Sequence, residues 1–162
     1  RRNFYNEFHR GIEMTTIAYK DGIIAYDSRC IDSDGVIVDD DYDKRLSFRN
    51  LNFFFSGSPS QFDEFVELYN NRSSRSQVLN ATCFVVDDGS LFLSSMRQSG
   101  DEWIVWKEKL RFGNPCAIGS GERFALVHMD HGLTAEEAVM ETMKRDSNSG
   151  GRVRTFSVAD GR

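Results

Sequence analysis

Three pairs of short apolar segments, each pair joined by a tight turn, constrain the fold of this chain more than any other feature. Turns of the type Lys-Asp-Gly, Arg-Asn and Asp-Asp-Gly between apolar runs predict β-hairpins. The flanking segments are residues 16–19 with 23–27, 44–48 with 51–57, and 81–86 with 90–95. Because the strands of a hairpin run in opposite directions, we expect antiparallel sheets.

A helix is predicted after the second hairpin. Its apolar residues recur at helical spacing and are Phe62, Phe65, Val66 and Tyr69. Ser58 is a suitable N-cap, Pro59 suits the first turn, and Gln61 completes a Ser-x-x-Gln capping box. We therefore expect a helix that starts at Ser58 and buries one face.

Two further helices and a strand are expected towards the C-terminus. The segment "AIGSG" (117–121) leads from a strand into a helix that stops at Gly132. Thr134 and Glu137 form a capping box for the next helix, which we expect to reach "RDSNSGG" (145–151), before "RVRTFSV" forms a strand. Short strands are also expected at 36–38 and 102–108. This order predicts an α+β fold with helices outside two antiparallel sheets.

The composition indicates one globular domain. With 162 residues, 40% of them hydrophobic, the chain can bury about two-thirds of its unfolded surface. Its net charge of −5 offers no basic surface to nucleic acid or anionic lipid. No apolar run approaches the roughly 18 residues that a membrane-spanning helix needs. We interpret the acidic run "DDDYDK" (39–44) as solvated loop.

The cysteines and histidines predict no metal, no cofactor and no disulfide framework. Cys30, Cys83 and Cys116 are odd in number and widely spaced, which favours a reducing cytoplasm. For His128 and His131, a solvated helix face is a simpler interpretation than a zinc site. The chain also lacks a Gly-rich loop of the nucleotide-binding type, so energy-dependent steps would need a separate chain.

Five motifs resemble those of proteasome β subunits. They occur in the same order and are "TTIAYKDGIIAYDSR", the lysine of "DKRLSF", "FFFSGS", "AIGSG" and "RDSNSGG". The bacterial HslV-type protease is similar in the first four. The chain thus resembles the N-terminal nucleophile hydrolases from Thr15 almost to its C-terminus. The resemblance implies a four-layer α-β-β-α sandwich for residues 15–162, preceded by an extension, residues 1–14.

Thr15 is the candidate nucleophile. A threonine hydroxyl reacts poorly unless a base removes its proton, and a free α-amine with a pKa of about 8 suits that task. The chain has no G-x-S-x-G motif of the kind that carries a serine nucleophile. The alternative is that Thr15 and Thr16 only open a strand.

The resemblance assigns further residues to the site. It places Lys44 beside Thr15, where a positive charge favours proton removal, and Asp27 beside Lys44. Read without the resemblance, a surface ion pair is the favoured interpretation of Asp27 and Lys44. Ser120, Asp146 and Ser149 would orient the amine and relay protons, and Gly57 would offer its N–H to the developing oxyanion. The alternatives are that Ser120 caps a helix, that residues 147–151 form a turn, and that Gly57 is a plain turn residue.

The extension bears directly on activity. While Met14 is attached, the Thr15 nitrogen is an amide and does not act as a base. Relatives with propeptides usually carry glycine before the threonine, whereas this chain has methionine. We expect Met14 to be the initiator, removed because a small residue follows; a self-cleaved propeptide is the alternative.

The expected function is that of a cytoplasmic threonine endopeptidase subunit. The resemblance implies a ring-forming homo-oligomer, polypeptide substrates held between strands by backbone hydrogen bonds, and a separate ATPase unfoldase. Among Phe53, Phe54 and Phe55, at least one faces the core and another is expected to reach the specificity pocket. The short segment after the Ser58 helix argues against a double ring. Two alternatives stay open: a non-catalytic structural or assembly subunit, and an amidohydrolase acting on small amides.

Overall fold

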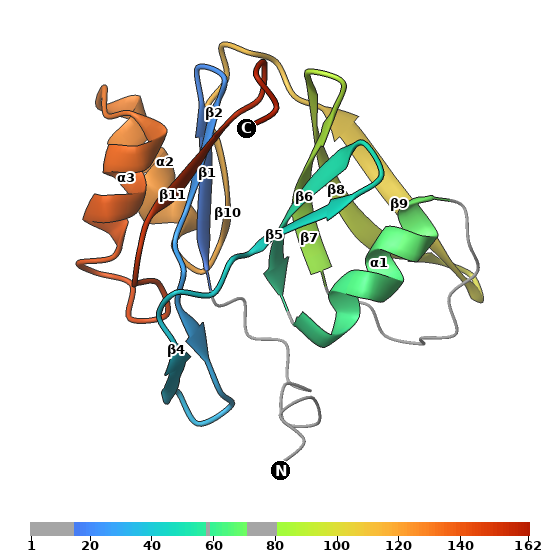
Figure 1. Ribbon diagram of the computed structural model, residues 1–162, viewed down its shortest axis with the longest axis horizontal. Coiled ribbons are helices and arrows are strands. Elements are labelled where there is room, and N and C mark those ends of the chain that lie inside the picture. The colour runs from blue at the N-terminus through green and yellow to red at the C-terminus, as the bar shows by residue number, and fades with distance from the viewer. Residues whose placement is uncertain (1–14, 58, 71–80) are drawn as a thin grey trace.

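The computed structural model describes residues 15–57, 59–70 and 81–162 (Figure 1). In this part of the chain, one antiparallel sheet has four strands. Their order is β10 (Cys116–Gly119), β1 (Thr16–Lys20), β2 (Ile23–Tyr26) and β11 (Arg154–Ser157). β1 and β2 form the predicted hairpin, whose turn places Asp21 and Gly22 at positive φ. Strands from both ends of the described chain therefore meet in one sheet.

The second large sheet of the described chain has five strands in simple sequential order, all antiparallel. They are β5 (Arg45–Phe48), β6 (Leu51–Gly57), β7 (Ala81–Asp87), β8 (Ser90–Ser99) and β9 (Glu102–Lys109). The predicted Arg49-Asn50 and Asp-Asp-Gly hairpins are both confirmed. A small hairpin, β3 (Cys30–Ile31) with β4 (Ile37–Asp39), follows β2 in sequence; β4 is exposed, whereas Ile31 on β3 is buried.

The two sheets pack face to face. Phe54 points between them and makes edge-on ring contacts with Tyr26 at 5.4 Å and Phe156 at 5.0 Å between centroids. Its neighbours Phe53 and Phe55 point to the other face because side chains alternate along a strand. All three rings are almost fully buried. Burial of each ring contributes about 1.5–3 kcal/mol to the free energy of folding.

Helix α1 (Phe62–Tyr69) covers the outer face of the five-stranded sheet (Figure 1). Its four predicted apolar residues are all buried, and Phe62 stacks on Phe55 at 4.2 Å. The α-helix begins later than predicted, because Pro59–Gln61 form a 3-10 turn and Gln61 makes no side-chain cap bond. Ser58, the predicted N-cap, lies outside the described residues, as do the extension 1–14 and most of the segment expected to be too short for a second helix.

Helices α2 (Glu122–Asp130) and α3 (Ala135–Thr142) cover the outer face of the other sheet (Figure 1). Small side chains, Ala18 and Ala25 on the sheet and Ala138 on α3, let the layers approach closely. Both bonds of the predicted capping box between Thr134 and Glu137 are present. In the described part of the chain, no helix is long and apolar enough to cross a membrane.

One helix is shorter than the sequence predicts. α3 ends at Thr142, whereas we expected it to continue to "RDSNSGG". The chain instead turns, with Asp146 N donating to Thr142 O at 2.9 Å and Ser149 N donating to Asp146 O at 3.1 Å. The turn directs the side chains of Asp146 and Ser149 towards the start of β1.

Candidate active site

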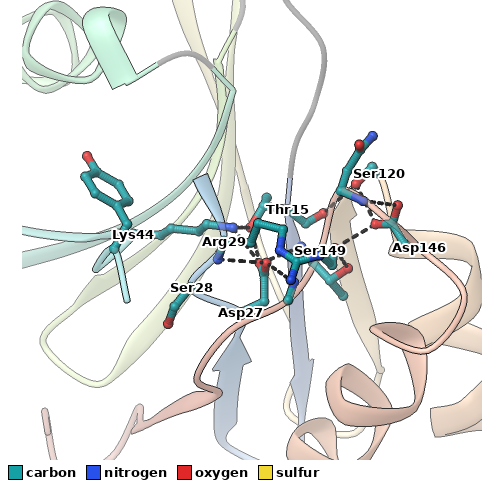
Figure 2. Close-up of polar contacts among 12 residues, drawn as sticks. Thr15, Asp27, Ser28, Arg29, Lys44, Ser120, Asp146 and Ser149 are labelled. Carbon is teal, nitrogen blue, oxygen red and sulfur yellow. Dashed lines mark hydrogen bonds and ion pairs between the residues drawn. The ribbon is translucent and has the colours of Figure 1, made fainter. Parts of the chain in front are cut away.

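Thr15 lies immediately before β1, at one end of the four-stranded sheet, and is 2% exposed. Figure 2 shows Lys44 and Asp146 approaching it from different sides. One group of side chains contacts its hydroxyl, and a second group contacts its backbone carbonyl. The side-chain hydroxyl and the backbone carbonyl of Thr15 are thus each held by a different group of residues.

The hydroxyl of Thr15 is held by an ion pair. Thr15 Oγ1 donates to Asp27 Oδ1 at 2.6 Å and accepts from Lys44 Nζ at 2.5 Å. The same ammonium donates to Asp27 Oδ1 at 2.6 Å. Pairing of β1 with β2 brings Asp27 to this end of the sheet, where its N–H donates to Thr16 O at 3.2 Å. Lys44 arrives from the other sheet, directly before β5.

The ion pair is buried rather than superficial. The side chains of Asp27 and Lys44 are 0% and 6% exposed, so the interpretation as a surface pair is wrong. Three backbone N–H groups also donate to the Asp27 carboxylate: those of Thr16, Arg29 and Gly150. Burial lowers the pKa of Lys44, and the negative charge of Asp27 opposes that shift.

The second group surrounds the backbone carbonyl of Thr15. Ser120 Oγ lies 3.2 Å from Thr15 O and 2.6 Å from Asp146 Oδ2, and Gly121 N donates to Thr15 O at 3.3 Å. Ser149 Oγ donates to Asp146 Oδ2 at 2.6 Å and lies 2.6 Å from the hydroxyl of the residue after Thr15. Ser120, Asp146 and Ser149 therefore form one hydrogen-bonded cluster beside Thr15.

Two simpler interpretations of these residues, a helix cap at Ser120 and a turn at 147–151, can be compared with the structure. Ser120 does not cap α2, because Gly121 occupies the N-cap position and no side-chain cap bond is formed. The predicted turn near residues 147–151 is present, and Ser149 belongs both to it and to the cluster.

Glycine is required where the chain passes closest to Thr15. Gly119 has a φ of +98°, and an added Cβ would overlap the Thr15 carbonyl oxygen. A Cβ on Gly121 would overlap the side-chain oxygen of Thr16. The "GSG" motif therefore lets the β10–α2 turn approach β1 closely enough for the Ser120 contact.

A small recess opens beside Thr15. Its volume of about 20 Å³ is enough for about one water molecule. Gly57, at the end of β6 with a φ of +128°, lines the same recess. Of the three phenylalanines considered for a specificity pocket, Phe55 lines this recess. The remaining lining residues are Arg29, Cys30, Tyr42, Lys44, Pro59 and Phe62.

The ion pairs around this site were not predicted from the sequence. After Asp39, which ends β4, the acidic run is an exposed loop, as expected, but two of its aspartates also form ion pairs: Asp40 with Arg29 at 2.8 Å and Asp41 with Arg154 at 2.8 Å. The sequence offered one indication of these pairs: it contains the aspartates of this run and also the arginines of "DSR" and "RVR". Within the described residues, no group of three His, Cys, Asp or Glu side chains is placed to hold a metal ion.

Two solved structures resemble this chain over most of its length. No protein-family model and no curated protein matches its sequence. Thiobacillus denitrificans BPH, solved in complex with epoxomicin, is 18% identical, covering 88% of this chain and 96% of that chain with a TM-score of 0.59. Eukaryotic HslV from Trypanosoma brucei is 15% identical, covering 88% and 97%, also with a TM-score of 0.59. This chain therefore has the fold of the HslV-type N-terminal nucleophile hydrolases, as the order of its motifs predicts.

Proposed function

We propose that this chain is a threonine-type endopeptidase subunit of a proteasome- or HslV-like protease, with Thr15 as its nucleophile. The observation that carries the proposal is the buried Thr15 hydroxyl, which lies 2.6 Å from Asp27 and 2.5 Å from Lys44. It borders a recess that Gly57 also lines. An ordinary strand-opening threonine needs neither a buried lysine nor an adjoining recess.

The reaction requires a chain that begins at Thr15, so Met14 must first be removed to free the Thr15 amine. The amine accepts the hydroxyl proton as Oγ1 attacks the peptide carbonyl carbon, and a C–O bond forms. Collapse of the tetrahedral intermediate breaks the C–N bond, and the leaving amine takes that proton. The resulting ester is then hydrolysed by water. Lys44 stabilises negative charge on Oγ1, while Asp27 holds the ammonium in place.

The second cluster would position the terminal residue. Ser120 contacts the carbonyl of Thr15 and Asp146 at once, so it fixes the backbone next to the reacting amine. Through their hydrogen bonds, Asp146 and Ser149 provide a path along which protons could be relayed. Gly57 would donate its N–H to the oxyanion, and a donor of this type contributes about 3–4 kcal/mol to transition-state stabilisation.

The substrate would be an extended polypeptide beside the end of β6. Backbone hydrogen bonds to a strand bind many sequences with similar affinity, whereas side-chain pockets select among them. Phe55, which lines the recess, would contribute to that selection.

The wider assembly belongs to the same proposal. Residues 15–162 would form one domain, with its layers in the order α2 and α3, four-stranded sheet, five-stranded sheet, α1. The three apolar clusters between successive layers support this α-β-β-α arrangement. Copies of the chain would form a ring in the cytoplasm, which restricts access to the site, and a separate ATPase would unfold folded substrates.

One feature favours a second candidate function. Met14 precedes Thr15 in the sequence, and a chain that keeps it would lack the free amine. Such a chain would serve as a structural or assembly subunit.

Peptidase assays on a chain expressed from Met14 test the proposal. Quenched fluorescent peptides and small amides are supplied to the wild type and to Thr15→Ala, after the N-terminal residue of each has been determined. Peptide cleavage that depends on Thr15 supports the proposal. Cleavage of small amides alone would identify an amidohydrolase, and a wild type that begins at Thr15 yet cleaves neither substrate would contradict an enzymatic function.

A further inference from the structure

The position of Lys44 depends on a loop that joins the two sheets. Lys44 O accepts from Phe55 N at 3.2 Å, so the backbone of Lys44 is attached to the five-stranded sheet. Its side chain nevertheless reaches Thr15 and Asp27 at the end of the other sheet. Residues 40–43, which lead into Lys44, are held instead by the four-stranded sheet and its adjoining turns.

Arg154, on β11, makes several of the contacts that hold this loop. Its Nη2 donates to Asp41 Oδ1 at 2.8 Å and to Asp41 O at 3.1 Å. Its Nη1 donates to Ser28 Oγ and to Tyr42 O, the latter at 3.5 Å. Ser28 follows Asp27 directly, and its carbonyl accepts from Tyr42 N at 3.0 Å. One guanidinium thus joins the residue after Asp27 to the loop before Lys44.

The chemistry of these contacts suits arginine rather than lysine. A guanidinium is planar and donates several hydrogen bonds in fixed directions, whereas an ammonium is a compact point charge. The Asp41 carboxylate is 67% exposed, so its ion pair with Arg154 contributes little to the free energy of unfolding. Ser28 is fully buried. The contact with Asp41 therefore fixes geometry more than it stabilises the fold.

We infer that Arg154 is a positioning residue for the proposed catalytic centre: it holds the Lys44 loop against the Asp27 turn and so sets the distance from Lys44 Nζ to Thr15 Oγ1. This inference rests on the proposed function. Arg154 touches neither Thr15 nor the recess among the contacts described, so it acts through the backbone of residues 41–42 and through Ser28.

The test compares Arg154→Met, Arg154→Lys and Asp41→Asn with the control Arg152→Met. Arg152 is exposed, lies two residues before Arg154, and makes its described hydrogen bonds through backbone atoms. Arg152→Met removes the same positive charge as Arg154→Met but leaves the loop contacts intact. Active sites are titrated with an electrophilic peptide that labels Thr15 covalently, and kcat and KM are measured per titrated site. Thermal midpoints show whether each variant is folded.

The expected result is a loss in kcat on the order of tenfold to a hundredfold for Arg154→Met, with little change in KM, because small misplacements of reacting groups are costly. Arg154→Lys should recover only part of the loss. Asp41→Asn should show a smaller loss, because the contacts of Arg154 with Ser28 and Tyr42 remain.

Two results would overturn the inference. In an active wild type, equal kcat values for Arg154→Met and Arg152→Met would remove the positioning role and leave the proposed function intact. Full recovery by Arg154→Lys would show that charge alone matters. A processed wild type without peptidase activity contradicts the proposed function itself, so the two failures are distinguishable.

Discussion

Lys44 Nζ lies 2.5 Å from the Thr15 hydroxyl, although Thr15 precedes a strand of the four-stranded sheet and Lys44 precedes a strand of the five-stranded sheet. The contact forms only when the two sheets are packed together, because neither sheet alone holds both groups. The candidate site therefore depends on the tertiary fold.

Replacing Lys44 tests the role of that contact. We expect Lys44→Met to lower kcat by about 10²–10⁴-fold, the range that loss of assisted proton transfer produces. Removing one partner of a buried ion pair also costs about 3–5 kcal/mol in the free energy of unfolding. Peptidase assays and urea denaturation measure the two effects. Lys144→Met is the matched control, since Lys144 is 66% exposed and pairs with Glu141.

A double variant separates catalysis from stability. Asp27→Asn with Lys44→Met removes both charges, so the unfolding free energy should recover relative to Lys44→Met while activity stays low. Restored activity in the double variant would show that Lys44 serves the fold alone.

Ser120→Ala should lower kcat by about tenfold or more, because the Thr15 backbone loses a partner that fixes its orientation. The thermal midpoint should change much less than in the Lys44 variant. Steady-state kinetics measure the first effect. Ser47→Ala is the control, because exposed Ser47 donates to Asn52 and does not line the recess. Equal kcat values in the two variants would exclude a role for the Ser120 hydroxyl.

Gly57→Ala should lower both stability and activity. With a φ of +128°, alanine at this position should be strained by about 1–3 kcal/mol, and relief of that strain would turn the N–H away from the oxyanion. Denaturant midpoints and kcat check the two effects. Gly113→Ala is the control, because an added Cβ at Gly113 meets no atom within 4 Å. A fully active Gly57→Ala enzyme would contradict the oxyanion assignment.

Tyr26 predicts a pH dependence of stability. Burial, together with the nearby Asp43 carboxylate, raises the pKa of Tyr26 from 10.0 to about 12. Between these values the folded state binds more protons than the unfolded state, so stability is lost as pH rises from 10 to 12. Urea midpoints across this range should fall more steeply in the wild type than in Tyr26→Phe. Parallel curves would contradict the assignment; the other tyrosines are common to both proteins.

The hairpins were predictable because their signals are local. Asp21, Arg49 and Asp88 adopt positive φ in tight turns, and the apolar runs on either side specify the strands. The Thr134–Glu137 capping box was predictable for the same reason, because its two residues are only three positions apart.

The errors arose where distant contacts override local preference. The helical pattern after Thr134 has no strong stop, and α3 ends at Thr142 because Asp146 and Ser149 turn towards β1. The aspartates of the acidic run are exposed, as expected, but their ion pairs were not predicted because the partner can be far away in sequence: Asp41 and Arg154 are 113 residues apart. Ordered motifs indicated which residues gather at the site, but sequence spacing alone does not reveal which arginine holds which loop.

Intact-mass analysis of a chain expressed from Met14 and treated with an electrophilic peptide probe, followed by peptide mapping, tests the central claim most directly. We predict that the chain begins at Thr15, carries one adduct on that residue, and that Thr15→Ala carries none. A chain that keeps Met14 yet cleaves peptides at the full rate, or a Thr15→Ala chain as active as the wild type, would contradict the account.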